Sequence, residues 1–212
     1  MRIGVVRFPG TNCDADVFQM VENSSHEPVW LWHQDRFDVK SVDSVIIPGG
    51  FSYGDYLRCG ALASRSAVMK SVSEFAEQGR PVLGICNGFQ ILCESGLLPG
   101  VLLRNESVKF IDDWVELSVE NGNEYFAKKI PVKKRFCLPI AHGEGRYFAP
   151  PEELKKIQDK GQVWLSYVKN PNGSLKDIAG LMNEKKNVFG LMPHPERAMQ
   201  SWMGGTDGGL FL

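Results

Sequence analysis

The chain has 212 residues, of which 43% are hydrophobic and 10% aromatic. This length and composition suffice for a substantial core and exclude the collagen-like, disordered and mini-protein classes. With 24 basic and 25 acidic residues, the net charge of -1 excludes the positive field that nucleic-acid binding needs. No apolar stretch reaches the roughly 18 residues of a membrane span. The five cysteines include no C-x-x-C pair, so we expect free thiols, a cytoplasmic location and no contact with nucleic acid or membrane.

Short apolar runs alternate with helix-like segments over the first hundred residues. Strands are predicted at residues 3–8, 29–32, 45–47 and 81–85. Helices are predicted over residues 14–23 and 61–78 and from residue 88 to residue 93. Continuous apolar strands that alternate with amphipathic helices are typical of a parallel sheet covered by helices.

The pattern changes after residue 100. Residues 114–119 alternate like a half-exposed strand, and further strands are predicted at residues 163–168, 178–182 and 188–192. The turn-forming residues 170–173 predict a hairpin. No repeat or linker divides the chain. We therefore expect a single domain over residues 1–212 of the α/β class, with a mostly parallel sheet flanked by helices and with antiparallel additions.

The segment with the most chemical information is Gly84-Ile85-Cys86-Asn87-Gly88, which follows a predicted strand and precedes a predicted helix. This is the cysteine counterpart of a nucleophile elbow, in which paired glycines let strand and helix approach closely. A thiolate at a helix N-terminus is stabilised by free N–H groups and the helix dipole. A lone cysteine is more often a core residue, but this setting favours Cys86 as a nucleophile.

A thiol nucleophile needs a base and a group that orients the base. Of the four histidines, His194 is the strongest candidate because it lies between two prolines. Pro195 favours an extended backbone at His194, and residues two apart in an extended segment point the same way, so Glu196 can reach the imidazole. Taken alone, this segment is more often a surface turn; together with Cys86 it predicts a catalytic triad.

Acyl transfer also needs donors for the developing oxyanion, usually backbone N–H groups. One is expected from Asn87, the residue after the nucleophile. The second is expected from Gly50, in a glycine loop that directly follows a predicted strand. No G-x-G-x-x-G pattern follows a strand, so a dinucleotide site is disfavoured.

Together these motifs resemble the class I (triad) glutamine amidotransferases, in content and in order along the chain. Residues 8–14, 49–58 and 140–147 are similar, more narrowly, to the glutaminase subunits of phosphoribosylformylglycinamidine synthases. The resemblance covers almost the whole chain. The chain departs from the family's pattern at residues 207–212, where a further terminal helix is expected.

The resemblance implies that Cys86 attacks the amide of glutamine, with His194 as base and then acid, and Glu196 as its orienter. A glutamyl thioester is then hydrolysed to glutamate. Gln90 and the backbone around residues 142–144 (His142, Gly143 and Glu144) would bind the amino and carboxylate end of glutamine.

The same resemblance implies partners rather than cofactors. Ammonia would pass to a large synthetase subunit that uses ATP and Mg²⁺, with a small accessory subunit in the complex, while this chain itself needs no metal or cofactor. Aromatic and arginine residues are enriched at interface hot spots. We therefore expect the partner to dock on such residues beside the glycine loop at residues 49–50 and beside residues 142–144. The expected docking residues, which also include a leucine, are Tyr53, Tyr56, Leu57, Arg58, Arg146 and Tyr147.

Three other functions are alternatives to a glutamine amidotransferase. A zinc deaminase could use His194 and Glu196 but requires a P-C-x-x-C ligand pair, which the sequence lacks. A redox-sensing or repair protein of similar fold would keep Cys86 without needing the His194-Pro195-Glu196 segment. A catalytically silent binding module would not need an intact Cys, His and Glu set.

Overall fold

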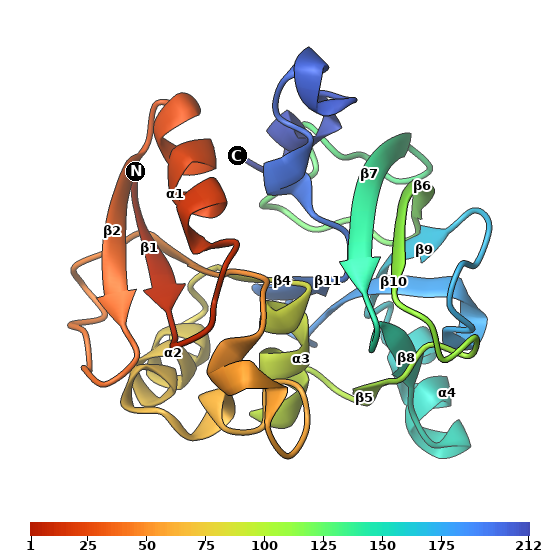
Figure 1. Cartoon of the computed structure of the whole chain (residues 1–212), viewed down its shortest axis with the longest axis horizontal. Helices are drawn as coiled ribbons and strands as arrows, with labels where there is room; N and C mark the ends of the chain where they lie inside the picture. Colours follow the sequence, from red (N-terminus) through yellow and green to blue (C-terminus); the bar gives the residue numbers. More distant parts are fainter.

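A nine-stranded mixed sheet runs through the centre of the computed structural model, which describes residues 1–212 (Figure 1). The strand order is β2-β1-β3-β4-β11-β10-β9-β6-β7. The strands are β1 (Arg2–Arg7), β2 (Glu27–Trp32), β3 (Ser44–Ile47), β4 (Val82–Ile85), β6 (Ile111–Val119), β7 (Arg135–His142), β9 (Val163–Tyr167), β10 (Ile178–Met182) and β11 (Val188–Leu191).

Pairing in this sheet changes from parallel to antiparallel at β11. The neighbours from β2 to β11 pair in parallel. From β11 to β7 every pairing is antiparallel, including the β9–β10 hairpin around residues 170–173 that the turn residues predicted. The predicted α/β fold with antiparallel additions is confirmed.

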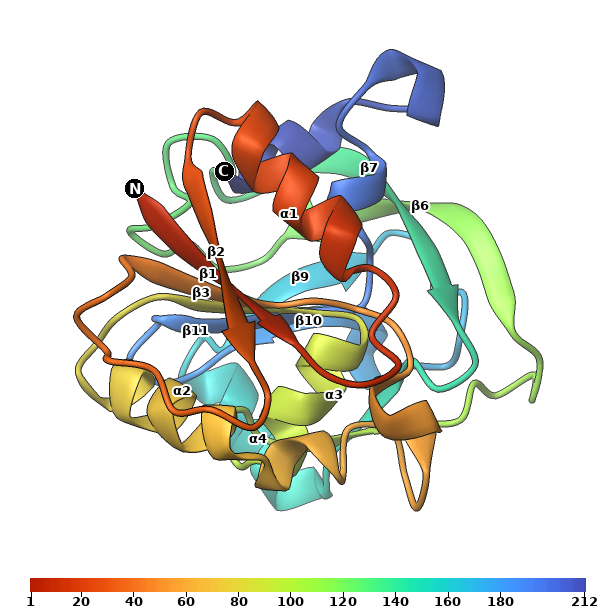
Figure 2. The same ribbon diagram turned by 60° about the vertical axis from the view of Figure 1, so that its left-hand side comes forward.

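Helices cover both faces of the sheet (Figure 2). On one face lies α1 (Asp14–Asn23), whose Val17, Met20 and Val21 are buried at helical spacing. On the other lie α2 (Ala67–Glu77), α3 (Asn87–Glu94) and α4 (Pro151–Asp159). A small second sheet pairs β5 (Val101–Leu103) with β8 (Arg146–Phe148). The parallel strands are therefore buried between helices, as expected.

The helix predicted over residues 61–78 begins later than expected, at Ala67. Gly60 has a φ of +81°, and a Cβ there would lie 2.8 Å from the backbone nitrogen of Ile91. The chain therefore turns where it packs against α3, forms a 3₁₀ turn at Ala63–Arg65, and becomes extended at Ser66 before α2 starts.

The end of the chain forms no further α-helix, in agreement with its departure from the family's pattern at residues 207–212. Residues Asp207–Phe211 form a 3₁₀ helix instead. Phe211 is 2% exposed and contacts the rings of Phe126, Phe136 and Trp164 at centroid distances of 5.7 to 5.9 Å. Burial of this aromatic side chain holds the terminus against the sheet.

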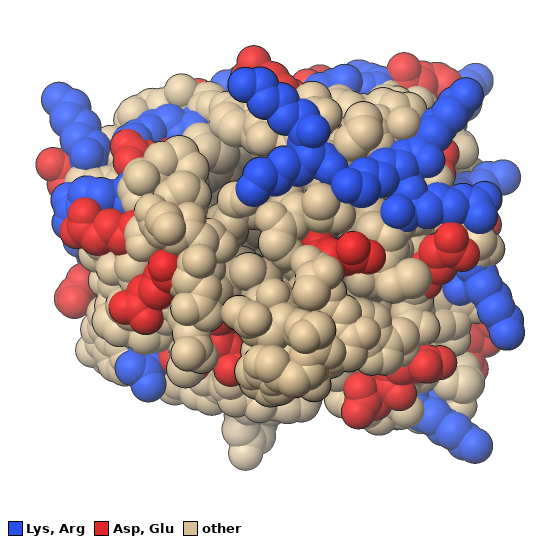
Figure 3. Space-filling model, turned by 90° about the horizontal axis from the view of Figure 1, so that it is seen from above, with Lys and Arg blue, Asp and Glu red and all other residues tan.

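Charges of both signs lie on the face shown in Figure 3, with Lys and Arg gathered across its upper half, acidic groups near the centre, and a largely uncharged area below the centre. This distribution agrees with the net charge of -1. None of the helices combines the length and the apolar character needed to cross a bilayer.

Candidate active site

Cys86 occupies a strained strand-to-helix turn, as the elbow motif predicted. It is the N-cap of α3, with φ +49° and ψ -103°. A residue with a side chain rarely adopts a positive φ and does so only where its surroundings fix the conformation. Here β4 ends at Ile85 and α3 begins at Asn87, so the turn has a single residue to complete it.

The two glycines flanking Cys86 are required by close packing. A Cβ on Gly84 would lie 2.6 Å from the carbonyl oxygen of Gly88, inside the strand-to-helix turn itself. A Cβ on Gly88 would overlap the carbonyl oxygen of Ile47, at the end of β3. The absence of side chains therefore lets α3 begin directly beneath the ends of two strands.

Three neighbouring parallel strands bring the sequence motifs together. The Gly49-Gly50 loop follows β3, Cys86 follows β4, and the segment of His194 follows β11; these strands are adjacent in the order β3-β4-β11. The carboxyl ends of parallel strands meet at one edge of the sheet, where ligands bind in open α/β sheets. A Cβ on Gly49 would lie 2.8 Å from His194 Cε1 and 3.3 Å from Cys86 Cβ.

His194 and Glu196 form a buried pair. Nδ1 of His194 lies 2.6 Å from Glu196 Oε1, and the two side chains are 2% and 0% exposed. Nε2 of His194 has no hydrogen-bond partner. Burial disfavours the imidazolium, but the charges of Glu196 and Cys86 outweigh it and raise the pKa of His194 well above its usual value. His194 therefore holds a proton at neutral pH.

The two expected oxyanion donors have free N–H groups. Neither Gly50 nor Asn87 donates its backbone N–H to another group of the protein. Gly50 has a φ of +124° and is packed against Asn12, so no other residue fits there. The Asn87 side chain accepts a hydrogen bond from Ser52 N at 3.2 Å and donates one to Gln90 Oε1 at 2.8 Å. Asn87 thus ties the glycine loop to α3.

These side chains line a cavity of about 430 Å³. It contains Gly50, Cys86 and His194 together with the residues expected to bind glutamine. Its lining residues are Asn12, Cys13, Gly50, Phe51, Asp55, Cys59, Cys86, Gln90, Phe110, Asp112, Ala141, His142, Gly143, Glu144, His194 and Arg197. The structure brings every predicted site residue into this cavity except Asn87 and Glu196, which lie directly behind it.

The glutamine-binding candidates are held by their own hydrogen bonds. Gln90 Nε2 donates to the carbonyl oxygen of Glu144 at 2.6 Å. Nδ1 of His142 lies 3.1 Å from Asn105 Oδ1, which also accepts from Gly145 N. Nδ1 is therefore the donor, and Nε2 is an acceptor without a partner. Burial and the His194 charge lower the pKa of His142 to about 4, so this imidazole is neutral.

Sequence reasoning missed two further thiols in the same cavity. Cys13 and Cys59 had no distinctive sequence setting, yet both line it. Burial and the nearby carboxylates of Asp55 and Glu144 raise the pKa of Cys59 far above its usual value, so this thiol stays neutral. Cys13 Sγ accepts a hydrogen bond from Arg197 Nη2 at 3.0 Å. No local pattern could link residues that are 184 positions apart.

A metal ion is another ligand that the residues around His194 could bind. Cys13, His194 and Glu196 offer ligand atoms within 4.8 Å of one another, a donor set that suits Zn²⁺. However, His194 Nδ1 is already bonded to Glu196 and Cys13 to Arg197, whose positive charge repels a cation. The arrangement fits a hydrogen-bonded triad better than a metal site.

The family model of the CobB/CobQ-like glutamine amidotransferase domain matches residues 1–206 of this chain. The chain belongs to this glutamine amidotransferase family. Its structure is also similar to that of PurLQS from Thermotoga maritima, with 46% identity, a TM-score of 0.91 and coverage of 99% of this chain and 94% of that one. A glutamine amidotransferase from Thermotoga maritima, 18% identical, shares the fold with a TM-score of 0.63 over 96% of this chain and 81% of that one.

The predicted family and enzyme class are thus confirmed for this glutamine amidotransferase. The match to PurLQS also confirms the resemblance to glutaminase subunits of phosphoribosylformylglycinamidine synthases. This assignment excludes the three alternative functions, a zinc deaminase, a redox sensor or repair protein, and a catalytically silent binding module.

The predicted docking residues have different environments in the glutamine amidotransferase. Tyr56 and Leu57 are 74% and 88% exposed, as docking requires. Arg58 is bonded to Glu94 through both its Nε and its Nη2. Tyr147 is fully buried, and its hydroxyl donates to the Pro99 carbonyl, so its prediction as a docking residue was wrong. Strand β8 alternates, and its middle residue, Tyr147, faces the core.

Proposed function

We propose that this chain is the glutaminase subunit of a phosphoribosylformylglycinamidine synthase, acting in purine biosynthesis. It hydrolyses glutamine through a Cys86–His194–Glu196 triad and a glutamyl thioester, and it delivers ammonia to a synthetase subunit. Residues 1–212 act as one amidotransferase domain. The observation that carries the proposal is the position of His194, between Glu196 Oε1 at 2.6 Å and the Cys86 elbow at the ends of β4 and β11.

The charge state of the triad indicates how the reaction starts. Because the pKa of His194 is raised, the imidazole carries a proton at the start of the reaction. The reactive form of a cysteine nucleophile is the thiolate. The thiolate attacks the amide carbon, and the free N–H groups of Gly50 and Asn87 bind the oxyanion. When the C–N bond breaks, His194 gives its proton to the leaving ammonia. It then takes a proton from the water that hydrolyses the thioester, and glutamate leaves.

The rest of the cavity supports recognition of glutamine. The neutral Nε2 of His142 is a free acceptor, suited to the substrate's ammonium group. Gln90, held against the Glu144 backbone, and the adjacent Gly143 define the far end of the site. Glutamine is small enough to fill a cavity of about 430 Å³ with its amide beside Cys86.

A partner is needed because free ammonia becomes ammonium in water near neutral pH, and ammonium is not a nucleophile. We infer that the large synthetase subunit, with its accessory subunit, covers the mouth of the cavity. Phe51 and Phe110 line the cavity and are exposed, and the exposed Tyr56 and Leu57 lie between its lining residues Asp55 and Cys59. Tyrosine is among the types enriched at interface hot spots. ATP and Mg²⁺ are used by the synthetase, and this chain has no cofactor of its own. The five free cysteines favour the cytoplasm.

The test is covalent labelling with an electrophilic glutamine analogue, followed by mass spectrometry of the labelled peptide. We expect a single adduct on Cys86, no adduct on Cys13 or Cys59, and no glutamate production by Cys86→Ser. Cys137→Ser, at an exposed cysteine, is the matched control and should be labelled like the wild type. Labelling of Cys13 or Cys59 with Cys86 unmodified would refute the proposal.

A further inference from the structure

The expected oxyanion donor Gly50 begins a strained segment, residues 50–57, which is named here the oxyanion loop. Within it Tyr53, Asp55 and Leu57 have φ values of +54°, +56° and +69°, a region that residues with side chains rarely adopt. Such a backbone persists only where the surrounding structure fixes it. The direction of the Gly50 N–H therefore depends on the contacts that hold this loop.

Tyr53 is the only one of residues 50–54 whose side chain makes a hydrogen bond. Its hydroxyl lies 2.6 Å from Nδ1 of His33, whereas Ser52 Oγ is buried without a partner. Burial raises the pKa of Tyr53 and lowers the pKa of His33, so both groups are uncharged at neutral pH. The phenol is the more acidic of the two and donates, and Nδ1 accepts.

His33 is a firm anchor for this hydroxyl. It directly follows β2 and is 6% exposed. Its backbone N–H donates to the Arg7 carbonyl of β1 at 3.1 Å, and its carbonyl accepts from Val68 N of α2 at 3.2 Å. The Phe8 ring packs against both members of the pair, with its centroid 6.5 Å from that of His33 and 6.3 Å from that of Tyr53. The sheet and α2 therefore set the position of His33.

The backbone contacts of the oxyanion loop on this side reach only another loop. Phe51 N donates to the Gly10 carbonyl at 3.2 Å, and Tyr53 N donates to the Pro9 carbonyl at 2.6 Å. Residues 9 and 10 belong to no helix or strand. The Tyr53–His33 bond thus ties the oxyanion loop to a residue that the sheet anchors.

Neither member of this pair can touch the substrate. Gly50 and Phe51 line the active-site cavity, but Tyr53 and His33 do not. The pair can therefore act on the reaction only by holding the loop.

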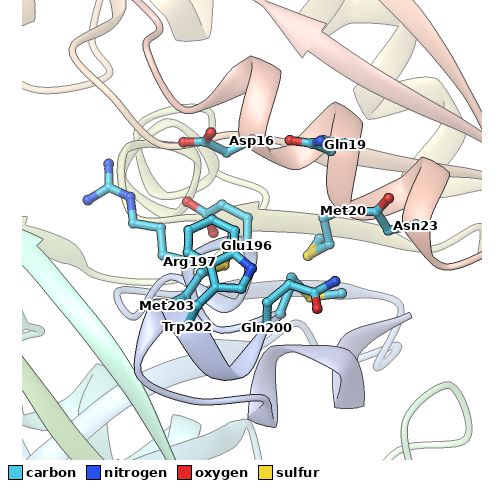
Figure 4. A pocket seen from close by; sticks show the side chains of 10 residues that line it. Asp16, Gln19, Met20, Asn23, Glu196, Arg197, Gln200, Trp202 and Met203 are labelled. Atoms are coloured by element: carbon cyan, nitrogen blue, oxygen red, sulfur yellow. The ribbon is translucent and has the colours of Figure 1, made fainter.

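The triad is held by different contacts. Figure 4 shows α1 packed over the segment of residues 196–203, with a cavity of about 690 Å³ between them. Arg197 Nη2 donates to Cys13 at the start of α1, and His194 N donates to the Pro139 carbonyl of β7 at 2.8 Å. None of these contacts includes Tyr53 or His33, so loss of their bond should leave the triad in place.

We propose that Tyr53 and His33 are positioning residues, whose hydrogen bond holds the oxyanion loop with the Gly50 N–H directed at the developing oxyanion. This inference rests on the proposed function, which assigns that role to Gly50. The oxyanion exists only during acyl transfer, so the bond contributes to turnover and not to the binding of glutamine.

The test measures glutamate production by the full-length chain mixed with the synthetase component. Tyr53→Phe removes only the hydroxyl and should lower kcat about tenfold or more with KM unchanged, because a misplaced donor stabilises the oxyanion less. His33→Leu should have the same effect. His33→Asn should restore most of kcat, since its Oδ1 is as many bonds from the backbone as Nδ1 and also accepts. The double variant Tyr53→Phe/His33→Leu should be no slower than either single variant.

Tyr125→Phe is the matched control. The Tyr125 hydroxyl also donates to a carbonyl, that of Gly79 at 2.8 Å, but it lies beside the amino ends of β3 and β4, so kcat should equal that of the wild type. A second measurement is the rate at which iodoacetamide alkylates Cys86, a displacement that forms no oxyanion. This rate should be the same in the wild type and Tyr53→Phe. Slower alkylation in Tyr53→Phe would mean that the nucleophile itself is disturbed, and it would overturn the inference.

Two further outcomes separate this inference from the proposed function. If the wild-type mixture makes no glutamate, or if Cys86→Ser makes it equally fast, the proposed function is overturned. If the wild type is active through Cys86 but Tyr53→Phe and His33→Leu have the same kcat as the wild type, only the inference is overturned. Circular dichroism checks that each variant is folded.

Discussion

The two ring nitrogens of His194 have different surroundings, which separates the expected effects of two substitutions. Nδ1 faces Glu196, and Nε2 is free at the cavity that holds Cys86. His194→Asn removes the group that moves both protons, so kcat for glutamine hydrolysis should fall by about 10² to 10⁴. Glu196→Gln removes only the orienting charge and should lower kcat less. Equal kcat values for wild type and His194→Asn at saturating glutamine would contradict these roles.

His142 makes the stability of the chain depend on pH. Its folded pKa of about 4 lies below the ordinary value of 6.5, so between these values the unfolded chain binds more protons. The stabilising contribution, on the order of 3 kcal/mol, is therefore complete above pH 6.5 and is lost as the pH falls toward 4. His194, with its raised folded pKa, acts in the opposite sense, and its contribution is lost as the pH rises through that value.

Urea unfolding of wild type and His142→Gln at several pH values isolates this contribution, because the other acidic groups titrate in both proteins. We expect the free energy of unfolding of His142→Gln to fall less steeply between pH 6.5 and pH 4. Parallel curves for the two proteins would show that His142 is not buried in its neutral form.

At the scale of elements, the elbow depends on how closely α3 approaches β3. Gly88→Ala places a Cβ against the Ile47 carbonyl and should lower the free energy of unfolding by about 1–3 kcal/mol, the usual effect of overpacking. It should also displace Cys86 and reduce labelling by the glutamine analogue. Gly209→Ala is the control, since nothing lies within 4 Å of its added methyl group. Equal urea midpoints for the two variants would contradict the packing argument.

Elements with a strong local pattern were predictable from the sequence, whereas those defined by their neighbours were not. The Gly84–Gly88 elbow and the apolar strands β1, β3 and β4 can be recognised from their own residues, by paired glycines and by continuous apolar runs. In contrast, β7 contains Pro139, which argues against a strand; it is tolerated because β7 is the edge of the sheet. Helix α4 fully buries only Ile157, so its apolar face is too narrow to recognise.

The candidate site shows the same division. The proposed triad residues and the two proposed oxyanion donors follow strand ends, and the short motifs that contain them could be recognised in the sequence alone. Cys13 and Asn105 enter the site through contacts with Arg197 and His142, far away in sequence. Such contacts depend on the finished packing, and no periodicity or spacing encodes them.

At the scale of the whole molecule, an aromatic cluster joins the end of the chain to the antiparallel half of the sheet. Phe211 packs against three rings and is almost fully buried. Phe211→Ala should therefore lower the free energy of unfolding by about 3–5 kcal/mol, measured by urea denaturation. Phe148→Ala, at a side chain that is 41% exposed, should have a much smaller effect. Similar losses for the two variants would mean that the terminus does not contribute to the core.

The left-handed backbone at Cys86 has a consequence for how this enzyme can evolve or be engineered. A residue with a side chain loses about 1–3 kcal/mol in the sparsely populated conformation of φ +49° and ψ -103°, and glycine loses less. Among residues without a thiol, glycine would therefore be more stable than alanine at position 86, the reverse of their usual order in helices. Selection for thermostability alone would favour folded chains that have lost the nucleophile, so any such screen must also require turnover.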